Sequence, residues 1–233
     1  MLTVITGATK GIGRALAQKF AAEGFDLALC ARTAADLDAL RHELLTAHPH
    51  LRIYTEVVDV QQKSAVQTFG KNLLDKFGRV DVLINNAGVF LPGAITEEVE
   101  DTLVQLIEIN LYSAYYLTRA LLPTMQAQNS GYIFNMCSIA SITAYPTGGS
   151  YSVSKFALLG FNKALREELK KTDIRVTALL PGAVRTPAWG DIDLPDERFI
   201  QANDIAAAVW CCYSMTAGAV VEELIIRPQQ GDI

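Results

Sequence analysis

Thr6-Gly7-Ala8-Thr9-Lys10-Gly11-Ile12-Gly13, near the start of the chain, is the stretch that decides the fold. It follows a short apolar run over residues 2–6 whose β-branched members are typical of a buried strand. It precedes a run over 12–23 in which apolar side chains recur at helical spacing. A glycine-rich turn between a first strand and a first helix is where α/β proteins bind phosphate groups, because the helix N-terminus offers unpaired N–H groups there.

Each glycine of this loop has a separate predicted use. Gly7 permits a sharp turn, Gly11 lets the backbone approach a pyrophosphate, and Gly13 lets the helix pack closely on the sheet. The spacing is GxxxGxG rather than GxGxxG, and a glycine triplet alone also fits a tight turn without a ligand. The position between strand and helix favours the phosphate-binding interpretation. The residues of the loop that we expect to contact a dinucleotide are Gly7, Thr9, Lys10, Gly11, Ile12 and Gly13.

The rest of the chain continues this alternation of apolar strands and amphipathic helices. Because fully apolar strands that alternate with helices form a parallel sheet covered on both faces, we predict one doubly wound, Rossmann-type α/β domain over residues 1–233, with about seven strands. A linker rich in Pro, Gly or Ser is missing from the sequence. Further strands are expected at 26–31, 52–58, 80–85, 132–136, 174–180 and 223–227, and helices after Thr33 and at 61–77, 97–128 (two helices joined without a clear break), 151–171 and 203–214.

Composition limits the possible partners. The chain has 233 residues, 50% of them hydrophobic, and a net charge of −5, so it can build a packed core but has no general attraction for nucleic acid or anionic membranes. Uninterrupted apolar runs fall short of the roughly 18 residues of a spanning helix. We expect the first residues to form a strand of the fold rather than a secretory leader. The 4 cysteines lack metal-type spacing. We therefore expect a cytoplasmic protein with buried free thiols, no metal site, and no nucleic-acid or membrane partner.

The end of the second strand bears on the choice between NAD and NADP. An NAD site usually has a carboxylate there for the ribose 2′-hydroxyl, whereas an NADP site needs a cation for the 2′-phosphate. Here the strand ends in Arg32 without a carboxylate, and Lys10 would face the same ribose. A guanidinium fork and an ammonium suit a phosphate, so we expect NADP(H) to be preferred over NAD(H). The alternative is that one or both cations point into solvent.

Asp59 and Val60 follow the third strand. A carboxylate at the carboxyl edge of a parallel sheet could accept a hydrogen bond from the adenine amino group. An aspartate in a turn or at a helix cap is an almost equally good interpretation. Both residues are candidates for the adenine end of the cofactor site.

Tyr151-Ser152-Val153-Ser154-Lys155 opens a predicted helix and carries the candidate chemistry. Residues four apart share a helix face, so the hydroxyl of Tyr151 and the ammonium of Lys155 can reach one site. The ammonium favours the phenolate and is expected to lower the tyrosine pKa from about 10. A general acid/base for alcohol–carbonyl exchange needs such a group. Ser138, after an earlier strand, could hydrogen-bond the substrate oxygen.

Together with the glycine loop, these residues resemble the short-chain dehydrogenase/reductase family, over about residues 2 to 227. The resemblance implies that Tyr151 transfers the proton and that Ser138 orients and polarises the carbonyl. It implies that Lys155 binds the nicotinamide ribose and tunes Tyr151, and that Asn110 positions a water in a proton relay.

The same resemblance extends the cofactor site. Asn85-Asn86-Ala87-Gly88, after the fourth strand, matches the family pattern, and its last three residues would line the adenosine side. Pro181-Gly182 follows the sixth strand, and the nearby residues would hold the nicotinamide end. The cofactor-binding residues that the resemblance implies are Asn86, Ala87, Gly88, Tyr151, Lys155, Pro181, Gly182, Val184 and Thr186.

Two segments depart from the family pattern. The stretch over 188–195 leads quickly to the next helix, so a lid there should be short. Trp189 in it is equally a candidate pocket wall or a packing anchor. The chain also lacks the glycine-rich turn after the last strand, which puts in doubt the transfer of any specific substrate. Family members are usually oligomers, so a homodimer or homotetramer is expected.

The expected function is an NADP(H)-dependent oxidoreductase that moves a hydride between nicotinamide and a carbonyl or secondary alcohol. Its pocket would be formed mainly by residues 139–146, residues 91–95 and Trp189, which favours a small, fairly apolar substrate. An epimerase or dehydratase of the extended relatives would need a larger substrate domain. A redox-sensing or regulatory module that binds NADP(H) without turnover is the other alternative, and the presence of all four candidate catalytic residues counts against it.

Overall fold

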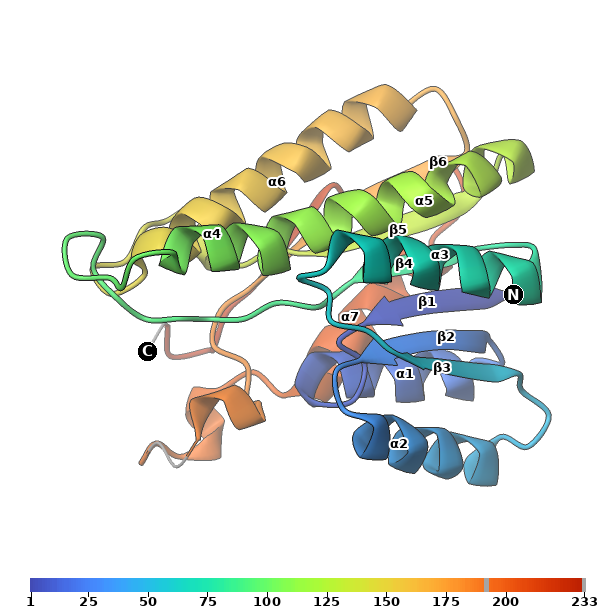
Figure 1. Ribbon diagram of the computed structural model, residues 1–233, viewed down its shortest axis with the longest axis horizontal. Helices are drawn as coiled ribbons and strands as arrows, with labels where there is room; N and C mark the ends of the chain where they lie inside the picture. Colours follow the sequence, from blue (N-terminus) through green and yellow to red (C-terminus); the bar gives the residue numbers. More distant parts are fainter. Residues whose placement is uncertain (191–192, 232–233) are drawn as a thin grey trace.

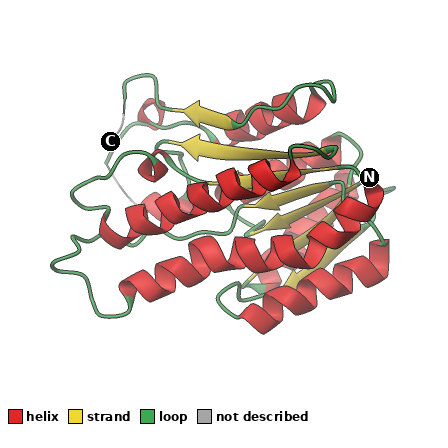
Figure 2. Cartoon of the chain, turned by 90° about the horizontal axis from the view of Figure 1, so that it is seen from above, coloured by secondary structure: helices red, strands yellow, loops and turns green. Residues whose placement is uncertain are grey.

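The computed structural model describes residues 1–190 and 193–231 of the chain. Seven strands form one sheet in the order β3-β2-β1-β4-β5-β6-β7, and every neighbouring pair is parallel. This confirms the predicted doubly wound, Rossmann-type sheet. Figure 2 shows the strands fanning across the molecule, as the twist of a parallel sheet requires. The strands are β1 (Leu2–Thr6), β2 (Asp26–Ala31), β3 (Ile53–Val57), β4 (Val82–Asn85), β5 (Gly131–Met136), β6 (Ile174–Pro181) and β7 (Glu223–Ile226).

Helices cover both faces of this sheet, as predicted (Figure 1). On one face α1, α2 and α7 close a core of aliphatic and aromatic side chains, and on the other α3, α5 and α6 close a second core. The helices are α1 (Gly11–Ala22), α2 (Ala34–Ala47), α3 (Lys63–Phe77), α4 (Thr102–Ile107), the π-helical turn η1 (Glu108–Tyr112), α5 (Ser113–Gln128), α6 (Gly149–Leu169) and α7 (Ala202–Ser214), with short 3-10 turns η2 (Ile139–Ser141), η3 (Pro187–Trp189) and η4 (Asp196–Arg198).

A cluster of aromatic rings fixes α1 against α7. Phe20 and Phe25 are fully buried and meet edge to face, with ring centroids 5.3 Å apart. Trp210 contacts Phe20 at 5.6 Å and Tyr213 contacts Phe25 at 5.4 Å. Edge-to-face pairs add roughly 0.5–1.5 kcal/mol each beyond the apolar area they bury. The last helix is therefore held to the first by specific contacts between side chains far apart in the sequence.

One predicted helix begins too early. Residues 97–101 were expected to be helical, but α4 begins only at Thr102 because Asp101 has a left-handed backbone, with φ 72°. The remainder of that region is continuous, and η1 joins α4 directly to α5. The other elements are confirmed, with small differences at their ends.

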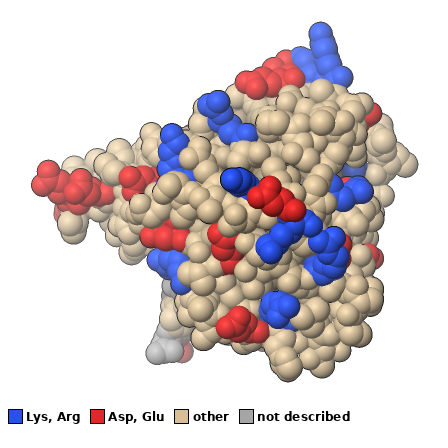
Figure 3. All heavy atoms as spheres, turned by 45° about the vertical axis from the view of Figure 1, so that its right-hand side comes forward, with Lys and Arg blue, Asp and Glu red and all other residues tan. Residues whose placement is uncertain are grey.

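The burial of the cysteines and the distribution of surface charge can be compared with the expectations from composition. Cys30, Cys137 and Cys212 are buried free thiols as predicted, whereas Cys211 is exposed. Within residues 1–190 and 193–231, acidic, histidine and cysteine side chains form no group that could hold a metal ion. In that same part of the chain, none of the helices is long and apolar enough to cross a membrane. Acidic and basic side chains are interspersed on the face seen in Figure 3, without a basic stripe there.

Candidate active site

The candidate residues gather where the strand order reverses. β1 and β4 are neighbours at the centre of the sheet, and an open α/β sheet binds its ligand beyond the carboxyl ends of the strands at such a point. The glycine loop follows β1, Asn86 follows β4, Ser138 follows β5 and Gly182 follows β6. The fold therefore brings these residues to one edge of the sheet.

The glycine loop needs its glycines. Gly7 and Gly11 have φ values of 64° and 51°, in the left-handed region that favours glycine. A Cβ on Gly13 would lie 2.2 Å from the carbonyl oxygen of Gly7, and one on Gly11 would lie 2.8 Å from Cγ2 of Thr186. The glycines therefore let the loop, the start of α1 and Thr186 pack closely, and a side chain at Gly11 or Gly13 would displace them. We call residues 7–13 the glycine cradle. Thr186, predicted for the nicotinamide end, lies directly against it.

Asn86 fastens the end of β4 to this loop. Its Nδ2 donates to the carbonyl oxygens of Thr6 and Gly7, at 2.9 and 3.1 Å. The backbone N–H groups of Asn86 and Ala87 donate to Thr6 Oγ1, at 3.1 and 2.9 Å. These four hydrogen bonds fix Thr6 and Gly7, at the start of the glycine loop, to the segment after β4. Direct binding of adenosine by Asn86, Ala87 and Gly88 stays a prediction.

Ser138, Tyr151 and Lys155 meet beyond the end of β5. Ser138 lies close enough to Tyr151 for its side chain to act on the pKa of the phenol. Lys155 Nζ lies 5.7 Å from the centre of the Tyr151 ring and donates to the carbonyl oxygen of Met136 at 2.8 Å. A Cβ on Gly88 would lie 3.4 Å from Lys155 Nζ, so the missing side chain there leaves room beside the ammonium.

The pKa of Tyr151 corrects one expectation. The nearby ammonium was expected to lower it, but burial raises it above 10.0, and the hydrogen bond with Ser138 offsets only part of that rise. Burial also lowers the pKa of Lys155 from 10.5 to about 8. The desolvation that disfavours the phenolate therefore also weakens the lysine charge that would stabilise it. Near neutral pH, Tyr151 is a neutral phenol.

Asn110 lies in the π-helical turn η1, a type of turn that is frequent at functional sites. Its Oδ1 accepts from the Val89 N–H at 2.8 Å, and its Nδ2 donates to the Val89 carbonyl oxygen at 3.1 Å. Nδ2 also donates to Ser154 Oγ at 3.0 Å, and that hydroxyl donates to the Tyr151 carbonyl oxygen at 2.7 Å. Asn110 therefore holds the backbone on both sides of the candidate site. Its part in a proton relay stays a prediction.

At the adenosine end, Arg32 is exposed directly after β2. Lys10 Nζ lies 3.1 Å from Asp36 Oδ2, a carboxylate that the sequence analysis missed because it belongs to the first turn of α2 rather than to the strand tip. Asp59 Oδ1 accepts from the Gln61 N–H at 3.1 Å, which supports the turn interpretation of that residue. Adenine binding by Asp59 and Val60 stays a prediction.

The residues predicted for the nicotinamide end, Gly182 and Val184, are held by β7 and by the segment after η4. The Gly182 N–H donates to the Ile226 carbonyl oxygen at 2.8 Å, and Val184 is buried in a parallel bridge to Ile200. Trp189 Nε1 donates to the Val184 carbonyl oxygen at 2.9 Å, and its ring packs 5.2 Å from that of Phe199. Trp189 thus has the contacts of a packing anchor. Residues 191–192 of the predicted short lid lie outside the described part of the chain.

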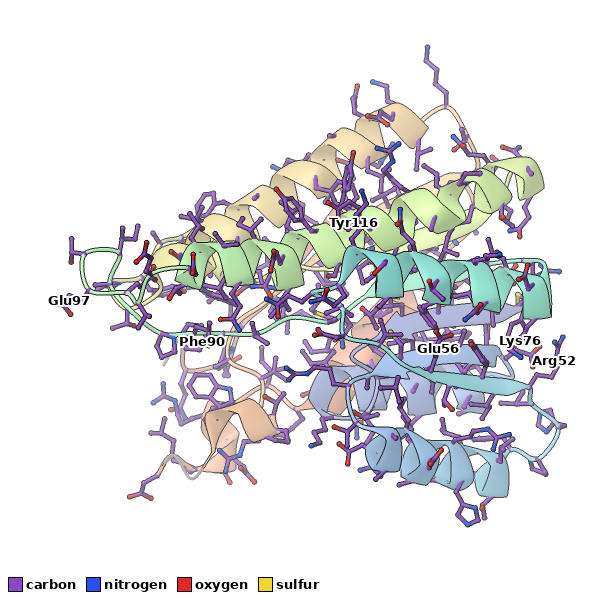
Figure 4. All side chains as sticks on the ribbon, viewed as in Figure 1. Arg52, Glu56, Lys76, Phe90, Glu97 and Tyr116 are labelled. Carbon is purple, nitrogen blue, oxygen red and sulfur yellow. The ribbon has the colours of Figure 1, made fainter. Side chains whose placement is uncertain are left out.

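Two residues near the site were not predicted. Phe90, labelled in Figure 4, is 50% exposed. Its ring packs edge to face against that of Tyr151, with centroids 4.8 Å apart. It directly precedes the segment that was expected to line the pocket. Glu98, from the same loop, binds Ser150 at the start of α6. In the sequence, Glu98 is one of several acidic residues in a polar stretch, so nothing there distinguishes it.

The parallel sheet, the glycine loop and the cluster of Ser138, Tyr151 and Lys155 are typical of one family of oxidoreductases, and the sequence matches that family. Residues 2–196 match the short chain dehydrogenase family. The chain therefore belongs to that family and is an oxidoreductase of it.

Particular relatives extend over nearly the whole chain. It is 36% identical over 242 residues to sepiapterin reductase of Chlorobaculum tepidum, with 100% of this chain and 98% of that protein covered. An alcohol dehydrogenase from the archaeon Thermococcus sibiricus, complexed with 5-hydroxy-NADP, is similar with TM-score 0.91 and 32% identity, covering 98% of this chain and 96% of that one. L-sorbose reductase from Gluconobacter frateurii, complexed with NADPH and L-sorbose, gives TM-score 0.89 and 28% identity, covering 97% and 95%.

Proposed function

We propose that this protein is an NADP(H)-dependent carbonyl reductase or alcohol dehydrogenase. The observation that carries the proposal is the meeting of Ser138, Tyr151 and Lys155 at the sheet edge that also carries the closely packed glycine cradle. The bound nicotinamide supplies or accepts the hydride at its C4 position. The cradle and the segment from Pro181 to Thr186 would hold it.

In the reduction direction, the protein contributes position and a proton. The Ser138 and Tyr151 hydroxyls donate hydrogen bonds to the substrate carbonyl oxygen and polarise the bond. As the carbon is reduced, the phenol proton of Tyr151 passes to the developing alkoxide oxygen. Lys155 holds the nicotinamide ribose and stabilises the phenolate that is left. A phenol that is neutral near pH 7 is a proton donor, which favours carbonyl reduction as the working direction.

NADP is proposed over NAD because Arg32 and Lys10 are the charged groups expected at the 2′-phosphate. Lys10 is already paired with Asp36, so Arg32 should carry most of the preference. Several structural relatives are complexed with NADP or NADPH, which supports the choice.

The substrate is proposed to be a small, fairly apolar ketone, aldehyde or diketone. Phe90 presents a half-exposed ring against Tyr151, and Ile142, four residues after Ser138 in the chain, is also half-exposed. The names of the sepiapterin and L-sorbose relatives describe reductases, which supports the direction of the reaction without fixing its substrate.

Titration with NADPH and with NADH, followed by nicotinamide fluorescence, tests the cofactor assignment on wild type and on Arg32→Ala. NADPH should bind at least about tenfold more tightly, or about 1.4 kcal/mol, and the difference should shrink in the variant. Equal binding of NADH would overturn the NADP preference, and binding of neither would overturn the oxidoreductase proposal. Turnover of a carbonyl substrate with NADPH would exclude a module without turnover.

We also propose that residues 1–233 act as one unit in a homodimer or homotetramer. Tyr112, Val153 and Phe156 are 43%, 43% and 47% exposed, on η1 and the outer face of α6, and burial between subunits would remove this apolar surface from water. Sedimentation equilibrium tests this, and a monomer at micromolar concentration would overturn it. The cytoplasmic location stays a prediction.

A further inference from the structure

Glu98 links the loop after Gly88 to the first turn of α6. Its Oε1 accepts a hydrogen bond from the Ser150 N–H at 2.8 Å, and its other carboxylate oxygen accepts one from the Ser150 hydroxyl. Ser150 is buried, with 4% exposure, and immediately precedes Tyr151. The carboxylate thus holds the residue next to the candidate proton donor.

Two glycines make room for this carboxylate. A Cβ on Gly149 would lie 2.3 Å from Glu98 Oε1, and a Cβ on Gly93 would lie 2.8 Å from Glu98 Cγ. The Gly93 N–H donates to the Thr147 carbonyl oxygen at 3.0 Å, which draws the loop against the segment before α6. Since a side chain at either glycine would displace Glu98, the backbone on both sides is shaped around this contact.

The Glu98 carboxylate lies at the N-terminus of α6, where the partial charge of a helix favours an anion. α6 runs for 21 residues and is preceded by Gly148, which has no side chain to accept a hydrogen bond from the first turn. The first N–H groups of a helix need acceptors, and its N-terminus carries partial positive charge. Glu98 provides from a distant loop what a serine or aspartate at the N-cap usually provides.

Tyr151 is therefore held from two directions. Glu98 fixes Ser150 on one side, and Asn110 fixes Ser154, whose hydroxyl donates to the Tyr151 carbonyl oxygen, on the other. Phe90, from the loop that carries Glu98, packs on the Tyr151 ring. Glu97, by contrast, is exposed at the outer tip of this loop (Figure 4).

We propose that Glu98 is a positioning residue that sets the first turn of α6, so that the Tyr151 hydroxyl meets the substrate oxygen. The inference rests on the proposed proton-transfer role of Tyr151. A misplacement of about 1 Å at a reacting group can lower a rate on the order of a hundredfold, so a loosened first turn should reduce turnover much more than cofactor binding, because Lys155, which would hold the nicotinamide ribose, lies in the next turn of α6. The glycine cradle for the cofactor belongs to α1, and Glu98 contacts α6.

The test compares Glu98→Ala, Glu98→Gln and Glu98→Asp with the neighbouring control Glu97→Ala. The readouts are kcat and KM with NADPH and 1-phenyl-1,2-propanedione, the Kd for NADPH, the melting temperature, and hydrogen exchange over residues 149–155. Glu98→Ala should lower kcat about tenfold or more, keep the Kd within about twofold, and speed exchange in that segment. Glu98→Gln keeps one acceptor for the Ser150 N–H and should lose less, whereas Glu98→Asp keeps the charge but is one methylene too short and should resemble the alanine variant. Glu97→Ala should match wild type.

Gly93→Ala gives a second approach if Glu98→Ala does not fold. The three nearest atoms to its methyl group all belong to the Glu98 side chain, with Cγ at 2.8 Å, so it should displace the carboxylate and reproduce the loss of kcat without removing a polar group. Wild-type kcat in Glu98→Ala, with or without faster exchange, would overturn the positioning role. A wild type that binds NADPH but reduces no carbonyl compound would overturn the proposed function itself, and this inference with it.

Discussion

Desolvation acts on the two central residues in opposite senses. It raises the pKa of the Tyr151 phenol and lowers that of the Lys155 ammonium to about 8. In the free protein, Lys155 therefore loses its proton before Tyr151 does. The lysine charge, rather than the tyrosine proton, should be the first group to limit reduction as the pH rises.

The pH profile of reduction follows from this order. Because Lys155 is charged below about 8 and neutral above it, kcat/KM should fall as the pH rises through about 8. The reverse oxidation needs the phenolate, so its rate should instead increase toward high pH. Initial rates in both directions between neutral pH and the limit of stability check this. A single fall in the reduction rate only above 10.0 would show that Tyr151 alone controls it.

Removal of the Tyr151 hydroxyl should abolish turnover. A positioned general acid contributes roughly 10²–10⁴-fold, so Tyr151→Phe should lower kcat by about that factor. The Kd for NADPH should change by less than about twofold, since the ring and its packing against Phe90 remain. Steady-state kinetics and a fluorescence titration measure the two quantities. Activity near that of wild type would exclude the proton-transfer role.

The roles of residues that lie at a fixed spacing in a helix or at the end of a strand could be predicted from the sequence. The roles of residues that depend on the path of a loop could not. Tyr151 and Lys155 share a helix face, and Ser138 follows the end of a strand, so the sequence predicts that they converge. Glu98 and Asp36 acquire their roles from segments far away in the chain, so neither was predicted. The direction of the Tyr151 pKa shift was also wrong, because burial is a property of the folded molecule.

At the level of elements, β1, the glycine loop and α1 form one rigid corner with the end of β4. Gly13 packs where a Cβ would lie 2.2 Å from the Gly7 carbonyl oxygen and 2.6 Å from Asn86 Nδ2. Neither neighbour can move without breaking the contacts between β1 and β4. The corner is therefore intolerant of even a methyl group.

Gly13→Ala should accordingly lose both stability and cofactor binding. Forcing a methyl group into a packed site costs roughly 1–3 kcal/mol, and here the displaced atoms also form the cradle. Gly160→Ala is the matched control, because a Cβ there meets nothing within 4 Å and a helical alanine is slightly stabilising. Urea denaturation and NADPH titration measure the two effects. Normal NADPH affinity in Gly13→Ala would contradict the role given to the cradle.

The regular elements were predictable from periodicity, and their irregular junctions were not. Apolar runs located each strand, and helical spacing located each long helix. The left-handed Asp101 and the π-helical turn around Asn110 have no such period. Asn110 in that turn contacts Val89 and Ser154, residues from other segments that only the folded chain brings to it.

For the molecule as a whole, the aromatic cluster of α1 and α7 joins the two ends of the chain. Phe20 contacts Phe25, Trp210 and Tyr213 at its centre. Phe20→Ala should therefore reduce the free energy of unfolding by about 3–5 kcal/mol. Val99→Ala, at a side chain 80% exposed, should change it by less than about 0.5 kcal/mol. Chemical denaturation measures both, and equal effects would show that the cluster is not part of the stabilising core.

The central position of β1 has a consequence for the newborn chain. One edge of β1 pairs with β2, but its other edge pairs with residues 82–84 of β4, which are synthesised about 80 residues later. At ~5–20 residues per second of translation, that edge stays unpaired for roughly 4–16 seconds. An open, apolar strand edge is a template for pairing with other chains. The strand β1 is fully buried in the folded protein, yet it is exposed to aggregation during translation. A chaperone that shields residues 2–6 during those seconds would raise the yield of folded protein.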